Sequence, residues 1–203
     1  MRVLQVSMTQ KPQAKKIRPR RLVVAITGAS GVIYGVRALE MLQKLDIESH
    51  VILSKAAEMT IAYELDITPK TVKGLATKPY AYGDVGAAIS SGSYQTDGML
   101  ILPCSVRTMS EIAFGVTTSL ISRAADVCLK ERRRLVLGFR ETPLHSGHIR
   151  AMGQVSDMGG IIAPIVPAFY NRPETIDDII HHTIGRLLDL FVIDCDDIKR
   201  WGE

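Results

Sequence analysis

Short apolar runs alternate with longer segments of helical periodicity from Leu22 onward. Each run has the length of a strand and is apolar at nearly every position, a pattern typical of strands buried on both faces of a parallel sheet. The five predicted strands are Leu22–Ile26, His50–Leu53, Met99–Leu102, Leu135–Leu137 and Ile161–Val166.

The segments between these runs carry apolar residues every three or four positions, which predicts helices. The predicted helices lie near 33–45 and 57–65 and over 106–114, 117–131, 146–157 and about 173–192, with 67–96 mostly loop. Strands that alternate with helices pair in parallel through right-handed crossovers. The pattern therefore predicts an α/β three-layer sandwich with a parallel, Rossmann- or flavodoxin-like sheet.

Polar residues directly follow the predicted strands. In open parallel sheets ligands bind beside the carboxyl ends of the strands, so these residues form the candidate site. They are Thr27–Gly31, Ser54–Lys55, Pro103–Thr108, Arg140–Glu141 and Pro167–Tyr170.

The segment Thr27–Gly31 has the sequence Thr-Gly-Ala-Ser-Gly and joins a strand to a helix. Its small residues let backbone N–H groups and the helix dipole approach a phosphate, although a tight turn that binds nothing is the alternative. NAD is disfavoured, because a dinucleotide site needs an acid after the second strand, where this chain has Ser54 and Lys55. A short-chain dehydrogenase is excluded, because no tyrosine is followed by a lysine four residues later.

A second polar segment, Pro103–Thr108, follows the third strand. Its hydroxyls and helix N–H groups suit another part of a mononucleotide or a flavin, and two adjacent loops favour such a ligand more than one loop does. Alternatively, Ser105 is an ordinary N-cap. Cys104 fits packing better than nucleophilic catalysis, since no histidine stands at a telling spacing.

Arg140-Glu141 follows the fourth strand and combines a permanent cation with a carboxylate. Arginine suits a phosphate and glutamate suits proton transfer, whereas an ordinary surface ion pair would contribute little energy. No metal is expected, because His181-His182 lack a third ligand of clear placement.

Length and composition fit one globular domain, with 203 residues, 46% hydrophobic and 23% charged. The net charge of +4 is concentrated at the N-terminus, where residues 1–21 carry seven bases and no acid. The rest of the chain has 18 bases and 21 acids. We therefore expect a basic, disordered extension over 1–21, one domain over 22–203 and no nucleic-acid partner, with RNA binding or targeting by the extension as the less favoured alternative.

The sequence shows neither an apolar stretch of membrane-spanning length nor an apolar signal core. This predicts a soluble, cytoplasmic protein without a membrane partner. The three cysteines form an odd set without CxxC spacing, so we expect reduced, mostly buried thiols rather than disulfides or a zinc knot.

Together these motifs resemble the UbiX-type flavin prenyltransferases, formerly described as small subunits of phenylacrylic-acid or hydroxybenzoate decarboxylases. The resemblance runs from about Leu22 to Trp201. Its motifs are Thr27–Gly31, Ser54–Ala57, Pro103–Ser105, Arg123–Val127, Leu129–Glu131, Arg140–Leu144, Pro167–Tyr170 and Arg200-Trp201.

The resemblance implies a homo-oligomer, typically a dodecamer, that joins FMN and dimethylallyl monophosphate into prenylated FMN, the cofactor of a UbiD-type decarboxylase. It assigns to FMN the residues Gly28, Ala29, Ser30, Ser54, Ser105, Val106, Arg107, Thr108 and Arg140. It assigns to the prenyl phosphate Arg123, Lys130, Arg140, Tyr170 and Arg186, with Trp201 helping to close the site.

The resemblance also implies that Glu141 is the acid/base group and that Glu64 is a second carboxylate near the flavin, with Ser30 helping to handle the proton. Fixed cations would stabilise the leaving phosphate without a metal. Such an enzyme needs no magnesium-binding aspartate motif.

Three positions depart from the family pattern. Phe139 stands where proline is usual, and Arg150 and Ala151 stand where glutamate and asparagine are usual.

Two other functions stay open. A flavin-binding decarboxylase of the sister group would use a histidine near the first helix, and none occurs in 1–49. A non-enzymatic flavin carrier would need the glycine loop but not the acid or the phosphate cations.

Overall fold

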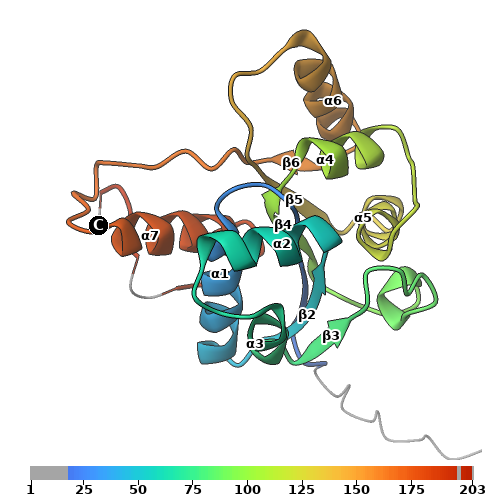
Figure 1. Cartoon of the computed structure of the whole chain (residues 1–203), viewed down its shortest axis with the longest axis horizontal. Coiled ribbons are helices and arrows are strands. Elements are labelled where there is room, and N and C mark those ends of the chain that lie inside the picture. The colour runs from blue at the N-terminus through green and yellow to red at the C-terminus, as the bar shows by residue number, and fades with distance from the viewer. Residues whose placement is uncertain (1–17, 196–197, 203) are drawn as a thin grey trace, which may run out of the picture.

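The computed structural model describes residues 18–195 and 198–202, which surround one parallel sheet (Figure 1). The strands are β1 Arg21–Ile26, β2 Glu48–Leu53, β3 Lys78–Tyr80, β4 Gly98–Cys104, β5 Arg134–Phe139 and β6 Ile161–Ile162. The helices are α1 Val32–Lys44, α2 Lys55–Glu64, α3 Pro69–Gly74, the 3-10 turn η1 Ala88–Ser90, α4 Val106–Ala113, α5 Leu120–Lys130, α6 Ser146–Asp157 and α7 Ile176–Asp189.

The strand order is β3-β2-β1-β4-β5-β6, and every described pairing is parallel. This is the Rossmann order, and without the short edge strand β3 it is the flavodoxin order. The predicted three-layer α/β sandwich with a parallel sheet is therefore confirmed. The chain order reverses between β1 and β4, which is the place where such sheets bind ligands.

Side chains along each strand alternate between two cores, because successive residues of a strand point to opposite faces. In β1, Val24 and Ile26 pack with α1 and α7, whereas Val23 and Ala25 pack with α4 and α5. Figure 1 shows α1 and α7 on one side of the sheet and α4, α5 and α6 on the other. Both faces are covered, which explains why the strands are continuously apolar.

The segment 67–96 differs from its prediction as mostly loop. It contains α3, the edge strand β3 and the turn η1. Strand β3 has three residues with Pro79 in the middle, and proline is tolerated only at a sheet edge because it cannot donate to a ladder. The sequence therefore lacks the apolar run that marked the other strands.

The predicted strand Ile161–Val166 is also shorter than expected. Only Ile161 and Ile162 form β6, although Ala163 N–H donates to Leu137 O over 2.9 Å and Ile165 N–H to Phe139 O over 3.1 Å. Pro164 has no N–H, so regular pairing ends while the segment still follows β5.

The described end of the basic extension is held by specific contacts. Arg18 and Arg20 pair with Asp97, over 2.6 and 3.4 Å, and β1 begins at Arg21. The Arg20 guanidinium also donates to the carbonyls of Phe191 and Val192, each over 2.6 Å. The remainder of the predicted extension, residues 1–17, lies outside the described residues.

None of the helices in the described part of the chain combines the length and the apolar sequence that a membrane crossing requires.

Candidate functional site

Thr27 joins the loops that follow β1 and β4. Its hydroxyl donates to Pro103 O over 2.8 Å and accepts the N–H of Ser105 over 2.8 Å, and the residue is fully buried. The backbone adds a bond from Thr27 N–H to Pro103 O over 3.2 Å. The glycine loop and the second polar loop therefore form one rigid unit at the point where the chain order reverses.

Three helices begin beside this unit. Helices α1, α2 and α4 start directly after the loops that follow β1, β2 and β4. Ser54 caps α2 by accepting Ala57 N–H over 3.0 Å, and Ser105 caps α4 by accepting Thr108 N–H over 3.4 Å. The capping role considered for Ser105 is thus present. The N–H groups that begin α1 bond to the Glu64 carboxylate, so it is the N-termini of α2 and α4 that give this edge of the sheet a partial positive charge that suits an anion.

A cavity of about 440 Å³ opens at these helix N-termini. Its size falls in the range of small-molecule sites, roughly 300–1,000 Å³. The residues that line it are Gly28, Ala29, Ser30, Ser54, Lys55, Ala56, Tyr82, Ser105, Val106, Arg107, Thr108, Arg140 and Glu141. All residues assigned to FMN from the sequence lie in this one cavity.

At two positions of the first loop the structure explains why the residue is glycine. A Cβ on Gly28 would lie 2.3 Å from the Cβ of Ala56, so only glycine lets α2 approach the loop. Gly31 has φ +95°, a left-handed conformation that side chains disfavour. The glycines therefore allow the close approach of backbone that a phosphate site needs.

Arg140 and Glu141 line the cavity from the end of β5. Arg140 N–H donates to Cys104 O over 3.1 Å, which fixes this segment beside the second loop. The Glu141 carboxylate accepts Thr142 N–H over 2.8 Å, and no ion pair joins it to Arg140 among the described residues. The surface ion pair considered above is absent, so both charges remain available to a ligand.

Glu64 lies at the end of α2, outside the cavity lining. Its carboxylate accepts the N–H groups of Gly31 and Val32, over 2.9 and 3.1 Å. It therefore caps the N-terminus of α1 from another helix and fixes the glycine loop.

Three lining residues were not assigned from the sequence. Lys55 and Ala56 begin α2, so the strand-end rule had already selected the loop of Lys55 without giving it a role. Tyr82 follows β3 by two residues. Had β3 been recognised, the same rule would have selected Tyr82 too.

The residues assigned to the prenyl phosphate fall into separate groups. Tyr170 and Arg186 lie beside or on α7, where the Tyr170 hydroxyl is 3.1 Å from His182 Nε2 and Arg186 pairs with Asp189. The Trp201 ring stands edge-on to Tyr170, with 5.6 Å between centroids. None of these side chains lines the cavity described above.

Arg123 and Lys130 lie on α5, in the opposite helix layer. Arg123 pairs with Asp126 over 2.8 Å and donates to Ser90 O over 3.2 Å, and Lys130 pairs with Glu131. Figure 1 shows α5 and α7 on opposite sides of the sheet. One chain therefore brings together the FMN residues but not the prenyl-phosphate residues.

Cys104, Cys128 and Cys195 are free and buried. Burial raises the pKa of the Cys104 thiol, and it raises the pKa of Cys128 to about 12. A thiol kept neutral in this way is a poor nucleophile. Within 18–195 and 198–202, no three His, Cys, Asp or Glu side chains are grouped as metal ligands would be.

The fold is that of an α/β protein whose cavity suits a phosphorylated ligand, and similar proteins identify its family. The sequence profile of a family described as Flavoprotein matches residues 10–187. A flavin prenyltransferase UbiX from Thauera aromatica is 51% identical over 181 residues, covering 89% of this chain and 93% of the relative. The chain therefore belongs to the UbiX-type flavin prenyltransferase family of flavoproteins.

Solved structures agree with this membership. A structure of AnUbiX (PadA1) in complex with FMN and dimethylallyl pyrophosphate is similar with a TM-score of 0.90 and 48% identity, covering 92% of this chain and 99% of the other. A dodecameric FMN-dependent UbiX-like decarboxylase from Escherichia coli O157:H7 has a TM-score of 0.87 and 43% identity, covering 90% and 100%.

Proposed function

We propose that this protein is a flavin prenyltransferase that joins the dimethylallyl group of dimethylallyl monophosphate to reduced FMN. The observation that carries this proposal is the convergence of the N-termini of α2 and α4 with Arg140 and Glu141 on one cavity. The family's activity fits this arrangement, because both substrates carry a phosphate and the reaction moves a proton.

The cavity fits FMN as one of the two substrates. Backbone N–H groups at the starts of α2 and α4 suit its phosphate, and the missing Cβ of Gly28 keeps the loop close to α2. The loop pair is short, and the chain has Ser54 and Lys55 where a dinucleotide site needs an acid. Reduced FMN supplies N5 and C6, the atoms that receive the dimethylallyl group.

Glu141 is the proposed proton-transfer group. Its carboxylate lies on the cavity wall next to Arg140 and accepts the N–H of Thr142, and no ion pair to it occurs within the described part of the chain. A carboxylate in reach of the flavin can accept the proton that ring closure releases. Glu64 instead holds the glycine loop through two N–H groups. We therefore propose that it positions Ser30 and the N-terminus of α1, in addition to the proton role that the resemblance implies.

The prenyl phosphate requires cations that stabilise the leaving group. Tyr170 and Arg186 lie on one layer of the sandwich, and Arg123 and Lys130 lie on the other. We propose that a neighbouring protomer supplies the second pair, so that each complete site lies between copies. The dodecameric state of the Escherichia coli relative supports this arrangement.

The direct test incubates purified protein with reduced FMN and dimethylallyl monophosphate under anaerobic conditions. We expect the flavin to gain one five-carbon prenyl unit by mass and to change its absorption spectrum. A parallel reaction with dimethylallyl pyrophosphate, the ligand of the AnUbiX complex, decides which phosphate ester is used. Unchanged flavin with both esters would favour the flavin carrier, and carbon dioxide release from an aromatic acid would favour the decarboxylase.

Complementation tests the shared site. We expect Lys130→Ala and Arg186→Ala each to lose most activity, and mixed oligomers from their co-expression to regain part of it, because some sites then receive native residues from both protomers. Mixed oligomers as inactive as the parents would place both residues in the same protomer's site.

A UbiD-type decarboxylase is the proposed consumer of the prenylated flavin, and the cytoplasmic location stays a prediction from the sequence. If the link holds, an apo-decarboxylase of that type should gain activity when mixed with this protein and its two substrates. It should stay inactive with FMN alone.

A further inference from the structure

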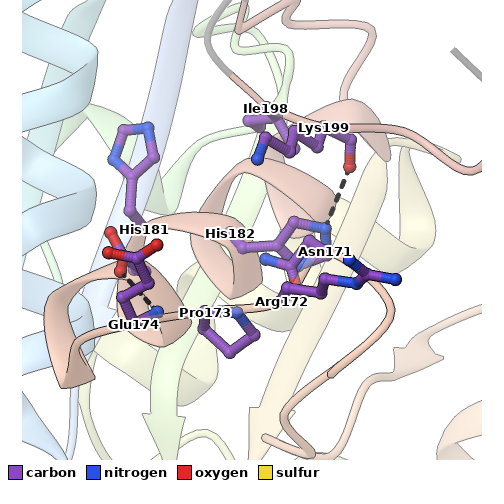
Figure 2. Close-up of a pocket in the computed structure, with 9 residues that line it drawn as sticks. Asn171, Arg172, Pro173, Glu174, His181, His182, Ile198 and Lys199 are labelled. Carbon is purple, nitrogen blue, oxygen red and sulfur yellow. Dashed lines mark hydrogen bonds between the residues drawn. The ribbon is translucent and has the colours of Figure 1, made fainter.

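His182 on α7 is a buried polar residue that the proposed reaction does not use. It is 6% exposed, and it forms part of the wall of a cavity of about 270 Å³ between α7, the loop 171–174 and the C-terminal residues Ile198 and Lys199 (Figure 2). The neighbouring His181 lines the same cavity (Figure 2) and also lines a smaller one with Arg37 and Met41 of α1. The two adjacent histidines therefore have different surroundings.

One nitrogen of His182 contacts two groups at once. Nε2 lies 3.1 Å from the Tyr170 hydroxyl and 3.3 Å from the carbonyl oxygen of Lys199. A carbonyl oxygen can only accept a hydrogen bond, so Nε2 carries the hydrogen. The Tyr170 oxygen shares this N–H and is an acceptor from His182, which leaves the phenol O–H free to donate elsewhere.

Two aromatic rings pack edge-on against the Tyr170 ring. The His182 and Tyr170 rings have an interplanar angle of 80° and a centroid distance of 5.3 Å. The Trp201 and Tyr170 rings have an interplanar angle of 87° and a centroid distance of 5.6 Å. Trp201 belongs to the short segment 198–202, which Lys199 ties to His182 and Arg200 ties to Asp189 over 3.0 Å. His182 therefore fixes both the phenol and the segment that covers it.

We propose that His182 is a positioning residue for Tyr170: its Nε2–H holds the phenol oxygen and the C-terminal segment, so that the Tyr170 O–H donates to the phosphate of the prenyl substrate. A phosphate oxygen accepts hydrogen bonds only, so a phenol whose oxygen already accepts one is correctly polarised to donate. The inference rests on the proposed role of Tyr170 and adds a residue that acts through it.

The kinetic test uses five variants. His182→Leu removes the donor, and we expect KM for dimethylallyl monophosphate to rise roughly tenfold, as for Tyr170→Phe, while FMN affinity stays within about twofold. His182→Gln keeps an N–H donor and should restore KM to within about threefold. The double variant Tyr170→Phe with His182→Leu should raise KM no more than the more impaired of the two single variants does, because both changes remove one shared interaction. His181→Gln is the matched control and should leave KM unchanged.

Limited trypsin digestion gives a readout that needs no activity. Cleavage after Lys199, followed by mass spectrometry, should accelerate several-fold in His182→Leu and return toward the native rate in His182→Gln, because local opening exposes the bond. Native KM and native cleavage in His182→Leu would overturn the proposal, and so would KM effects that multiply in the double variant. If the native protein transfers no prenyl group, the proposed function fails, whereas the cleavage rates still decide whether His182 anchors the segment.

Discussion

The charged residues at the two ends of the sheet have opposite arrangements. At the carboxyl end, Arg140 and Glu141 line the cavity without pairing to each other, and helices α2 and α4 begin at it. At the amino end, Arg21 Nε lies 2.7 Å from one oxygen of Glu48, and His50 Nε2 lies 2.9 Å from the other. Charges that do not pair with each other are suited to a ligand, whereas charges that satisfy each other stabilise the fold.

The amino-end group also shows the electrostatic cost of burial. His50 is fully buried and its Nδ1 is 2.9 Å from the Tyr80 hydroxyl. Burial lowers the pKa of His50 although Glu48 opposes the shift, and burial raises the pKa of Tyr80 to about 12. Burial alone would raise the pKa of Glu48, but hydrogen bonds from Arg21 and His50 outweigh it, so that pKa lies below its usual range.

Removing the unpaired acid should have the largest effect. We expect Glu141→Gln to lower prenyl transfer by roughly 10² to 10⁴, the range for a lost acid/base group, with little change in FMN affinity or melting temperature. Single-turnover flavin prenylation measured beside thermal melts separates chemistry from folding. Unimpaired transfer would remove Glu141 from the mechanism and move the proton role to Glu64 or the substrate phosphate.

Arg186→Ala should affect the second substrate alone. Loss of a charge-assisted hydrogen bond predicts a rise in KM for dimethylallyl monophosphate of roughly 10- to 100-fold. FMN affinity, measured by fluorescence titration, should stay nearly native because Arg186 lies outside the FMN cavity. A comparable loss of FMN affinity would show that the two groups of residues are not separate.

Thr27→Val tests whether the carboxyl end depends on one hydroxyl for its shape. The valine leaves Ser105 N–H without its buried partner and removes one of the two hydrogen bonds to Pro103 O, so we expect a loss of about 1–3 kcal/mol in urea unfolding. Thr27→Ser, which keeps the hydroxyl, is the control and should retain most of the stability. Equal stability of the two variants would mean that backbone contacts alone join the loops.

The smallest expected effect is a pH dependence from the amino end. The folded-state pKa values of His50 and Glu48 both lie below their ordinary values, so the unfolded chain binds more protons as the pH falls. Their stabilising contribution is complete above the ordinary histidine pKa of about 6.5 and declines at lower pH. Melting temperatures between pH 8 and 5 should fall more steeply for the native protein than for His50→Gln, and parallel curves would contradict this origin.

The cavity was predictable from the sequence because it depends on chain order. Strands buried on both faces leave continuous apolar runs, and the loops after parallel strands must meet at one edge. Phe139, one of the departures from the family pattern, is 3% exposed within the core beside α4 and α5, so the substitution is absorbed by packing.

Other features could not be predicted, for physical reasons. Strand β3 has no apolar run, because an edge strand of three residues needs little burial. The capping of α1 by Glu64 joins residues 33 positions apart, a contact that no local pattern reveals. Sequence order also gives no sign that Lys130 and Arg186 lie on opposite layers of one chain.

The contact between Gly28 and Ala56 has a consequence for how this family can diverge. Since a Cβ at position 28 would lie 2.3 Å from the Cβ of Ala56, position 28 cannot gain a side chain while Ala56 keeps its own. We expect the two sites to change together among relatives, with a larger residue at 28 accompanied by glycine at 56. Substitutions at these two positions should therefore be correlated. They should also accumulate more slowly than substitutions at two independent positions would.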